Sequence, residues 1–192
     1  MPPTPSTMLP LGTAAPPFRL PSTDGKIVSD TDYADAKGLL VIFACNHCPF
    51  VIHVKDEIAR IADNYMTQGV AVVAINPNDA DEYPDDSFEN MKERAIEWRW
   101  KFPYLHDESQ EVAKAYRAAC TPDFFLFDAD RILIYRGQLD DSRPNNGLPV
   151  NGADLRHALE ALLVGEKPTW EQKPSIGCSI KWKPGNAPPY AM

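Results

Sequence analysis

Apolar residues change their period twice between positions 39 and 75. Leu39–Phe43 is a continuous β-prone run, as expected for a strand buried on both faces. After Cys48 the apolar residues recur at steps of three and four, which predicts one face of an amphipathic helix: Val51, Val54, Ile58, Ile61 and Tyr65. Gly69 ends this pattern, and Val70–Ile75 is predicted to be a second buried strand. The order predicts a βαβ unit with parallel strands and a right-handed crossover.

The second half of the chain predicts shorter elements. Helical spacing from Phe88 to Trp98 predicts a second helix, Phe102–Leu105 a weak strand, and Ser109 the cap of a helix that carries Val112, Tyr116 and Ala119. Two apolar runs, Phe124–Phe127 and Ile132–Tyr135, are joined by four residues, which predicts an antiparallel hairpin. A last helix is predicted over residues 154–164. The pattern therefore predicts an α/β fold with a mixed sheet.

Composition excludes several classes of protein. The 192 residues suit one well-buried core rather than two enzyme domains. A net charge of −8, from 19 Lys and Arg against 27 Asp and Glu, argues against nucleic acid as the main partner. The apolar runs are far shorter than the roughly 20 residues of a membrane-spanning helix. We expect no secretory signal, because Met1–Phe18 has no basic residue before its weakly apolar part, and therefore expect a cytoplasmic protein.

Prolines gather at the two ends of the chain. Of the 19 prolines, seven lie in residues 1–21 and five in residues 165–192. These flanks are predicted to be extended arms of a single domain that spans residues 1–192. Both arms are expected to lie ordered against the core, because the C-terminal one carries apolar anchors.

The cysteine pair Cys45 and Cys48 lies where the first predicted strand passes to the first predicted helix. Unpaired N–H groups and the positive dipole end of a helix favour a thiolate at this position. His47 between them lowers the thiol pKa further when it is protonated. The arrangement predicts thiol–disulfide exchange, in which Cys45 attacks a substrate disulfide and Cys48 resolves the mixed disulfide. The pair is also expected to have a midpoint potential above the roughly −270 mV of thioredoxin.

Further motifs occur in the same order as in a known family. They are Leu11–Leu20 with Thr23-Asp24-Gly25, Cys45–Val51, Thr121–Phe125, Asp140–Pro144 and Pro174–Trp182. With these motifs the chain resembles the redoxins of the alkyl hydroperoxide reductase/thiol-specific antioxidant (AhpC/TSA) superfamily, and within it a peroxiredoxin-like subgroup of thioredoxin-fold proteins. The resemblance covers nearly the whole chain.

The resemblance implies a thioredoxin-like three-layer α/β/α sandwich with a mixed central sheet, an N-terminal extension and a C-terminal arm. It implies that Cys45 and Cys48 are the redox pair and that Pro122 is a cis-proline beside them. The backbone of Thr121 is then expected to pair with an incoming peptide. Neither a cofactor nor a metal is expected. The implied partners are a protein or small-molecule disulfide and a thioredoxin-type reductant. Peroxide is the substrate that the peroxidase interpretation implies.

The chain also departs from the patterns of related families. Ala44 replaces the Trp that commonly precedes the pair in thioredoxins, and Leu39 stands where their buried acid would lie. Against peroxiredoxins, Cys48 aligns with the peroxidatic cysteine and Cys45 takes the place of a Thr or Ser. Their arginine at the start of the hairpin is absent, which weakens the peroxidase interpretation.

The remaining two cysteines are open to two interpretations each. Cys120 is either a buried inert thiol or a further redox thiol near the pair. Cys178 is either a resolving thiol, alone or with Cys120, or a residue of the tail that packs on the core.

Other polar groups are assigned structural roles. A zinc set of Cys45, Cys48, His47 and His53 matches no standard spacing, and His53 is expected to point outward. His106-Asp107 is interpreted as a turn with a capping role. The acidic stretch from Asp79 to Asp86 is interpreted as a solvated loop.

Three hypotheses follow from the sequence. The first is a thiol–disulfide oxidoreductase that uses the pair. The second is a thiol peroxidase that uses Cys48. The third is a non-catalytic thioredoxin-like binding module whose cysteines are structural or hold a metal.

Overall fold

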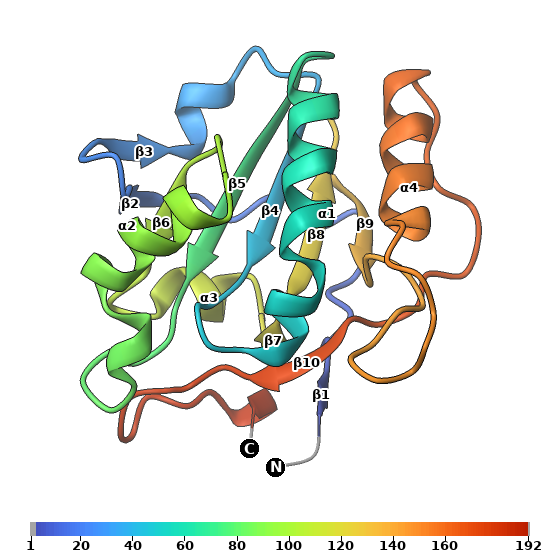
Figure 1. Cartoon of the computed structure of the whole chain (residues 1–192). Helices are drawn as coiled ribbons and strands as arrows, with labels where there is room; N and C mark the ends of the chain where they lie inside the picture. Colours follow the sequence, from blue (N-terminus) through green and yellow to red (C-terminus); the bar gives the residue numbers. More distant parts are fainter. Residues whose placement is uncertain (1–2, 192) are drawn as a thin grey trace.

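A computed structural model describes residues 3–191 of the protein (Figure 1). The central sheet has five strands in the order β6-β5-β4-β8-β9, where β4, β5 and β6 are parallel and β8 and β9 are antiparallel to their neighbours. Its strands are β4 (Gly38–Phe43), β5 (Val70–Asn76), β6 (Tyr104–His106), β8 (Asp123–Phe127) and β9 (Leu133–Gly137). The helices are α1 (Pro49–Met66), α2 (Phe88–Glu97), α3 (Glu111–Ala115) and α4 (Ala153–Leu163).

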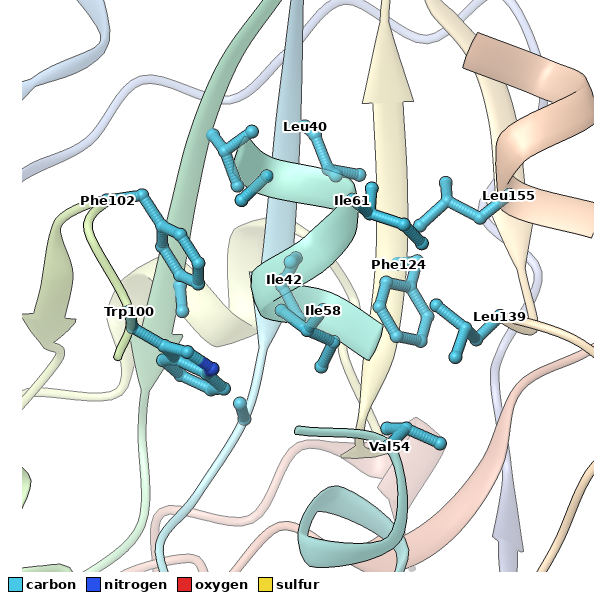
Figure 2. Close-up of a cluster of buried hydrophobic side chains, with 14 of the residues drawn as sticks. Leu40, Ile42, Val54, Ile58, Ile61, Trp100, Phe102, Phe124, Leu139 and Leu155 are labelled. Carbon is cyan, nitrogen blue, oxygen red and sulfur yellow. The ribbon is translucent and has the colours of Figure 1, made fainter. Parts of the chain in front are cut away.

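Helices cover both faces of this sheet, because alternate strand residues enter two separate cores. One core joins Leu40 and Ile42 of β4 to Ile58 and Ile61 of α1 and to Leu155 of α4. Figure 2 shows these side chains around α1, with Trp100 and Phe102 closing one side. The other core joins Leu39, Val41 and Phe43 to Ala113 of α3 and to Tyr116. The predicted α/β three-layer sandwich with a mixed sheet is therefore confirmed, as is the antiparallel hairpin.

Two smaller sheets tie the ends of the chain to this core. Strands β2 (Arg19–Pro21) and β3 (Ile27–Ser29) form a hairpin. Strand β10 (Ile176–Ser179) lies between β1 (Thr4–Pro5) and β7 (Cys120–Thr121), antiparallel to both. In Figure 1 the red strand β10 passes beneath the start of α1, with β1 beside it. The apolar side chains Leu9, Phe18 and Ile180 of the two arms are buried.

The structure corrects two expectations about caps and loops. The residue at the N-cap of α3 is Gln110 rather than Ser109, although the side chains of Ser109 and Asp107 accept the N–H groups of Glu111 and Ala113. The acidic stretch before α2 is not fully solvated, since Asp79 and Asp86 are buried. Asp86 belongs to a short helix, η2 (Pro84–Asp86), that folds back onto the carboxyl end of β5.

No helix within residues 3–191 is both long and apolar enough to cross a membrane.

Candidate active site

The cysteine pair lies at the carboxyl end of β4. The strand is buried throughout, and the chain leaves it at Ala44, whose N–H donates to the carbonyl of Ile75 in β5. Cys48 occupies the N-cap of α1 in an extended conformation, and Pro49 follows at the first helical position, where a missing N–H costs nothing. Both thiols are buried, with 1% of Cys45 and none of Cys48 exposed. The junction therefore holds two thiols at a helix N-terminus and out of water.

One residue, Thr121, touches both thiols. It precedes Pro122 through a cis peptide bond, at the end of the short strand β7. Its Oγ1 lies 3.3 Å from Sγ of Cys45. Its carbonyl oxygen lies 3.2 Å from Sγ of Cys48, which donates to it when the thiol carries its proton. The structure thus brings Cys45 and Cys48 together with Thr121 and Pro122, although more than 70 residues of sequence separate the cysteines from Thr121.

A third thiol meets this pair from the C-terminal arm. Cys178 of β10 is paired in register with Thr121, so the backbone that was expected to receive an incoming peptide already has a strand on it. Cys178 is half-buried and packs against the core cluster that contains Cys45 and Cys48, and its contact lowers the pKa of the Cys48 thiol. The lining of the pocket beside Pro122 includes Ile176 of this strand but neither cysteine of the pair. Strand β10 therefore covers the pair.

The contacts among Cys45, Cys48 and Cys178 shift the pKa values of the three thiols in different directions. Hydrogen bonds from Cys178 and from Cys45 hold the pKa of the Cys48 thiol well below its usual range, and the backbone N–H groups of Val51 and Cys178 act in the same direction. The same contact with Cys48, together with burial, raises the pKa of Cys45, and likewise that of Cys178. Two S–H donors facing one sulfur stabilise negative charge on that central sulfur. Cys48 is the sulfur so placed.

His47 forms an ion pair with a carboxylate that has no exposed surface. Its Nδ1 lies 2.7 Å from Oδ2 of Asp86, and its ring stacks on that of Tyr83 at 5.9 Å between centroids. The contact with Asp86 raises the pKa of His47, so the imidazolium persists to higher pH. Burial alone would raise the pKa of Asp86, but His47 and the amide donors around it lower it instead. A buried carboxylate thus favours the protonated form of His47, next to the cysteine pair.

Asp86 is the site residue that sequence reasoning missed. Its Oδ1 accepts from the backbone N–H of Asn46 at 2.6 Å, and its Oδ2 accepts from Nδ2 of Asn78 at 2.8 Å. Nδ2 of Asn76 also reaches Oδ1, at 3.2 Å. Asn46 in turn accepts from the buried hydroxyl of Tyr104 at 2.9 Å. Asn46, three residues after β4, and Asn76, the last residue of β5, are the signal in the sequence that a polar partner lies there.

The residues that could hold a metal ion differ from the set considered in the sequence. Ligand atoms of Cys45, His47 and Asp86 lie within 4.8 Å of one another, and His53 does not belong to this group. The oxygens of Asp86 already accept three N–H donors and the His47 ion pair, which leaves little capacity for a cation. His53 is half-buried and lines the pocket beside Pro122, whereas an outward direction was expected.

Among the described residues, the fourth cysteine, Cys120, has no hydrogen bond to the cysteine pair. It is fully buried, and its Sγ lies 3.8 Å from the carbonyl oxygen of Pro122. Burial raises its pKa well above the usual value. This environment is that of a small apolar side chain and not of a reactive thiol.

Comparison with known proteins decides the family. Residues 11–136 match the model of the AhpC/TSA family. The chain belongs to the AhpC/TSA family. It is 30% identical over 128 residues, 65% of this chain and 67% of the other, to the thiol-disulfide oxidoreductase ResA of Geobacillus thermodenitrificans. These relationships support an oxidoreductase role for this redoxin.

Two solved structures place this AhpC/TSA protein among thioredoxin folds. An uncharacterized conserved protein of Geobacillus kaustophilus is 59% identical, with a TM-score of 0.94 over 96% of this chain and 98% of that one. The thioredoxin domain of a thiol-disulfide oxidoreductase of Bacteroides vulgatus is 18% identical, with a TM-score of 0.64 over 81% and 99%. The second likeness shows the fold alone, and it confirms the predicted thioredoxin-like architecture.

Proposed function

We propose that the protein is a thiol–disulfide oxidoreductase whose working groups are Cys45 and Cys48. The observation that carries this proposal is the contact of Thr121 with both thiols at the N-terminus of α1. Membership of the AhpC/TSA family and the similarity to an oxidoreductase support it. Burial of the two thiols suits a pair that exchanges disulfides in a protected site.

The contacts favour Cys48 as the attacking thiolate, whereas position in the motif predicts Cys45. The contacts of Cys178 and Cys45 lower the pKa of Cys48, and only a thiolate attacks a disulfide. Its sulfur forms a bond to one sulfur of the substrate, whose S–S bond breaks and releases the first product thiolate. Cys45 then loses its proton and attacks Cys48, which releases the second product. The pair is oxidised by two electrons and the substrate disulfide is reduced.

His47 and Asp86 support this chemistry from one side. An imidazolium next to the pair stabilises the attacking thiolate by charge, and Asp86 keeps His47 protonated. Thr121 positions Cys45 through its hydroxyl, and its carbonyl accepts from Cys48 while that thiol carries its proton. Pro122 follows Thr121 directly and separates β7 from β8.

The substrate class is a disulfide of a protein or a small molecule, and the reductant is a thioredoxin-type dithiol. Small disulfides are the better fit to the arrangement with β10 in place, because the edge of Thr121 is already paired. A cytoplasmic location belongs to the same proposal, since a reducing compartment keeps all four thiols free.

A thiol peroxidase that uses Cys48 is the second candidate. The low pKa of this thiol favours it, since a peroxidatic cysteine reacts as a thiolate. No arginine or lysine within residues 3–191 donates a hydrogen bond to Cys45 or Cys48, although such a cation would polarise the peroxide. For this reason we rank disulfide exchange ahead of peroxide reduction.

One comparison separates the candidates. Wild type, Cys45→Ser, Cys48→Ser and the control Cys120→Ala are assayed for reduction of oxidised glutathione, for consumption of hydrogen peroxide and for bound zinc. The proposal predicts loss of turnover with oxidised glutathione in both pair variants and wild-type turnover in the control. Rapid peroxide turnover that survives Cys45→Ser and vanishes in Cys48→Ser would select the peroxidase instead. Stoichiometric zinc without either activity would select the binding module.

A further inference from the structure

The C-terminal arm holds its cysteine against the active site by several independent contacts. Ser175 Oγ donates to the carbonyl oxygen of Pro122 at 2.8 Å, and the N–H of Ile180 donates to the carbonyl of Ala119 at 3.1 Å. Further along, the N–H of Lys181 donates to Oδ1 of Asn78 at 2.9 Å. These anchors lie on both sides of Cys178. The position of its thiol is therefore built by the fold and is not that of a loose tail.

Gly177 lets the arm approach this closely. A Cβ at this position would lie 1.9 Å from the carbonyl oxygen of Thr121, a distance that no side chain can occupy. Any residue other than glycine would push β10 away from β7. The next residue is Cys178, which is paired in register with Thr121. The closest backbone approach of the arm thus lies next to the cysteine that meets the pair.

An extended peptide that adds a strand to an exposed edge is a common way for proteins to recognise a chain segment. Here β10 is that strand, antiparallel to β7, and it belongs to the same chain. It presents a cysteine to Cys48 at the edge that a substrate peptide would use. Because the strand is tethered and anchored, its thiol meets Cys48 at a high effective concentration.

We propose that β10 is an internal substrate strand and that Cys178 is a third redox thiol, which exchanges disulfides with Cys48. This inference rests on the proposed function, because it takes the Cys45–Cys48 disulfide as its starting point. Cys178 loses its proton and attacks the sulfur of Cys48. The bond between Cys45 and Cys48 breaks, a bond between Cys48 and Cys178 forms, and Cys45 leaves as a thiolate that takes up a proton. No electrons are gained or lost, so the exchange needs no further oxidant.

This exchange moves the disulfide toward the surface. Cys45 is 1% exposed, whereas Cys178 is half-buried in the arm. A reductant that cannot reach the buried pair can reach a disulfide that includes Cys178. The arm therefore connects a closed active site to the outside without opening the core.

The test uses Cys45→Ser, which removes the thiol that competes with Cys178 for Cys48. Reduced Cys45→Ser protein is treated with one equivalent of oxidised glutathione, and the released glutathione is counted while the disulfides are mapped by mass spectrometry. We expect a Cys48–Cys178 disulfide and two glutathione thiols released per protein. The Cys45→Ser/Cys178→Ser variant is expected to keep one glutathione on Cys48 and to release one. The Cys45→Ser/Cys120→Ala variant is expected to behave as Cys45→Ser alone.

Two failures are distinguishable. If Cys45→Ser keeps the mixed disulfide, or does not react, while wild type forms the Cys45–Cys48 disulfide, the role of Cys178 is wrong and the proposed function stands. If wild type forms neither the Cys45–Cys48 nor the Cys48–Cys178 disulfide, the proposed function fails and the inference fails with it. Circular dichroism of each variant confirms that the comparison is made between folded proteins.

Discussion

The Nδ1 atom of His47 lies 2.7 Å from Oδ2 of Asp86, a carboxylate with no exposed surface. This ion pair fixes a positive charge beside the cysteine pair, and the contact raises the pKa of His47. Its partner comes from a stretch of five acidic residues of which only Asp79 and Asp86 are buried. The charge balance of the site therefore depends on one carboxylate 40 residues from the motif.

Asp86→Asn is expected to lower the pKa of His47. The hydrogen bond and the charge of the carboxylate raise that pKa, so without them the imidazolium loses its proton at lower pH. We expect the pH midpoint of the His47 ring-proton shifts, followed by NMR, to fall by about one unit, which is about 1.4 kcal/mol. The matched control is Asp85→Asn, since Asp85 is exposed and only its backbone carbonyl reaches Asn46. An unchanged midpoint in Asp86→Asn would contradict the role given to this carboxylate.

The redox potential of the pair follows from the same charge. A stabilised thiolate favours the reduced state, so the midpoint potential is expected to lie above the roughly −270 mV of thioredoxin. His47→Asn removes the positive charge and is expected to lower the potential by about 30 mV, the equivalent of one pKa unit. Equilibration against glutathione redox buffers measures both values. A wild-type potential at or below that of thioredoxin would refute this prediction.

Asp123 makes stability depend on pH. It is fully buried, its two carboxylate oxygens have no hydrogen-bond partner among the described residues, and burial raises its pKa to about 8. In the unfolded chain the same group ionises near pH 3.9, so the folded state binds the proton more tightly between these values. Its stabilising contribution is therefore complete below about pH 4 and is lost as pH rises toward 8.

Asp123→Asn is expected to remove this dependence. Urea unfolding at pH 5 and pH 8 should show a smaller loss of stability in the variant than in wild type. The control is Asp130→Asn at an exposed position of the hairpin loop, for which the loss should equal that of wild type. An equal loss in Asp123→Asn and wild type would show that Asp123 does not titrate in this range.

Gly177→Ala tests how the arm covers the pair. The added methyl group meets the carbonyl of Thr121, so strand β10 must shift, at a cost of about 1–3 kcal/mol. We expect faster alkylation of Cys48 by iodoacetamide, because the arm no longer shields it. Gly185 lies in the same arm with open space where a Cβ would lie, so Gly185→Ala, which strains only the local backbone at a positive φ, serves as the control. If alkylation of Cys48 has the same rate in both variants, the arm does not gate access to the pair.

The sequence predicted the framework of the site better than its surroundings. The β4–α1 junction follows from hydrophobic period, because a doubly buried strand and an amphipathic helix have distinct patterns around Cys45 and Cys48. The resemblance also placed Pro122 beside the pair correctly. These features are local or belong to motifs.

Contacts between distant segments of the chain have no comparable signal in the sequence. In the sequence Asp86 looked like the other acidic residues of its stretch, because its burial arises only when η2 folds onto Asn46 and Asn76. The pairing of β10 with β7 depends on the absence of a side chain at Gly177, and a glycine in a proline-flanked tail has many possible reasons. The sequence therefore did not predict the register that sets Cys178 opposite Thr121.

The most direct measurement of the central claim uses the Cys178→Ser variant, in which the arm cannot compete. The reduced variant is treated with one equivalent of oxidised glutathione, and the products are counted and mapped. Exchange by the pair predicts two glutathione thiols released per protein and a disulfide between Cys45 and Cys48. A protein that stays fully reduced, or that keeps one glutathione without closing this disulfide, would contradict the account.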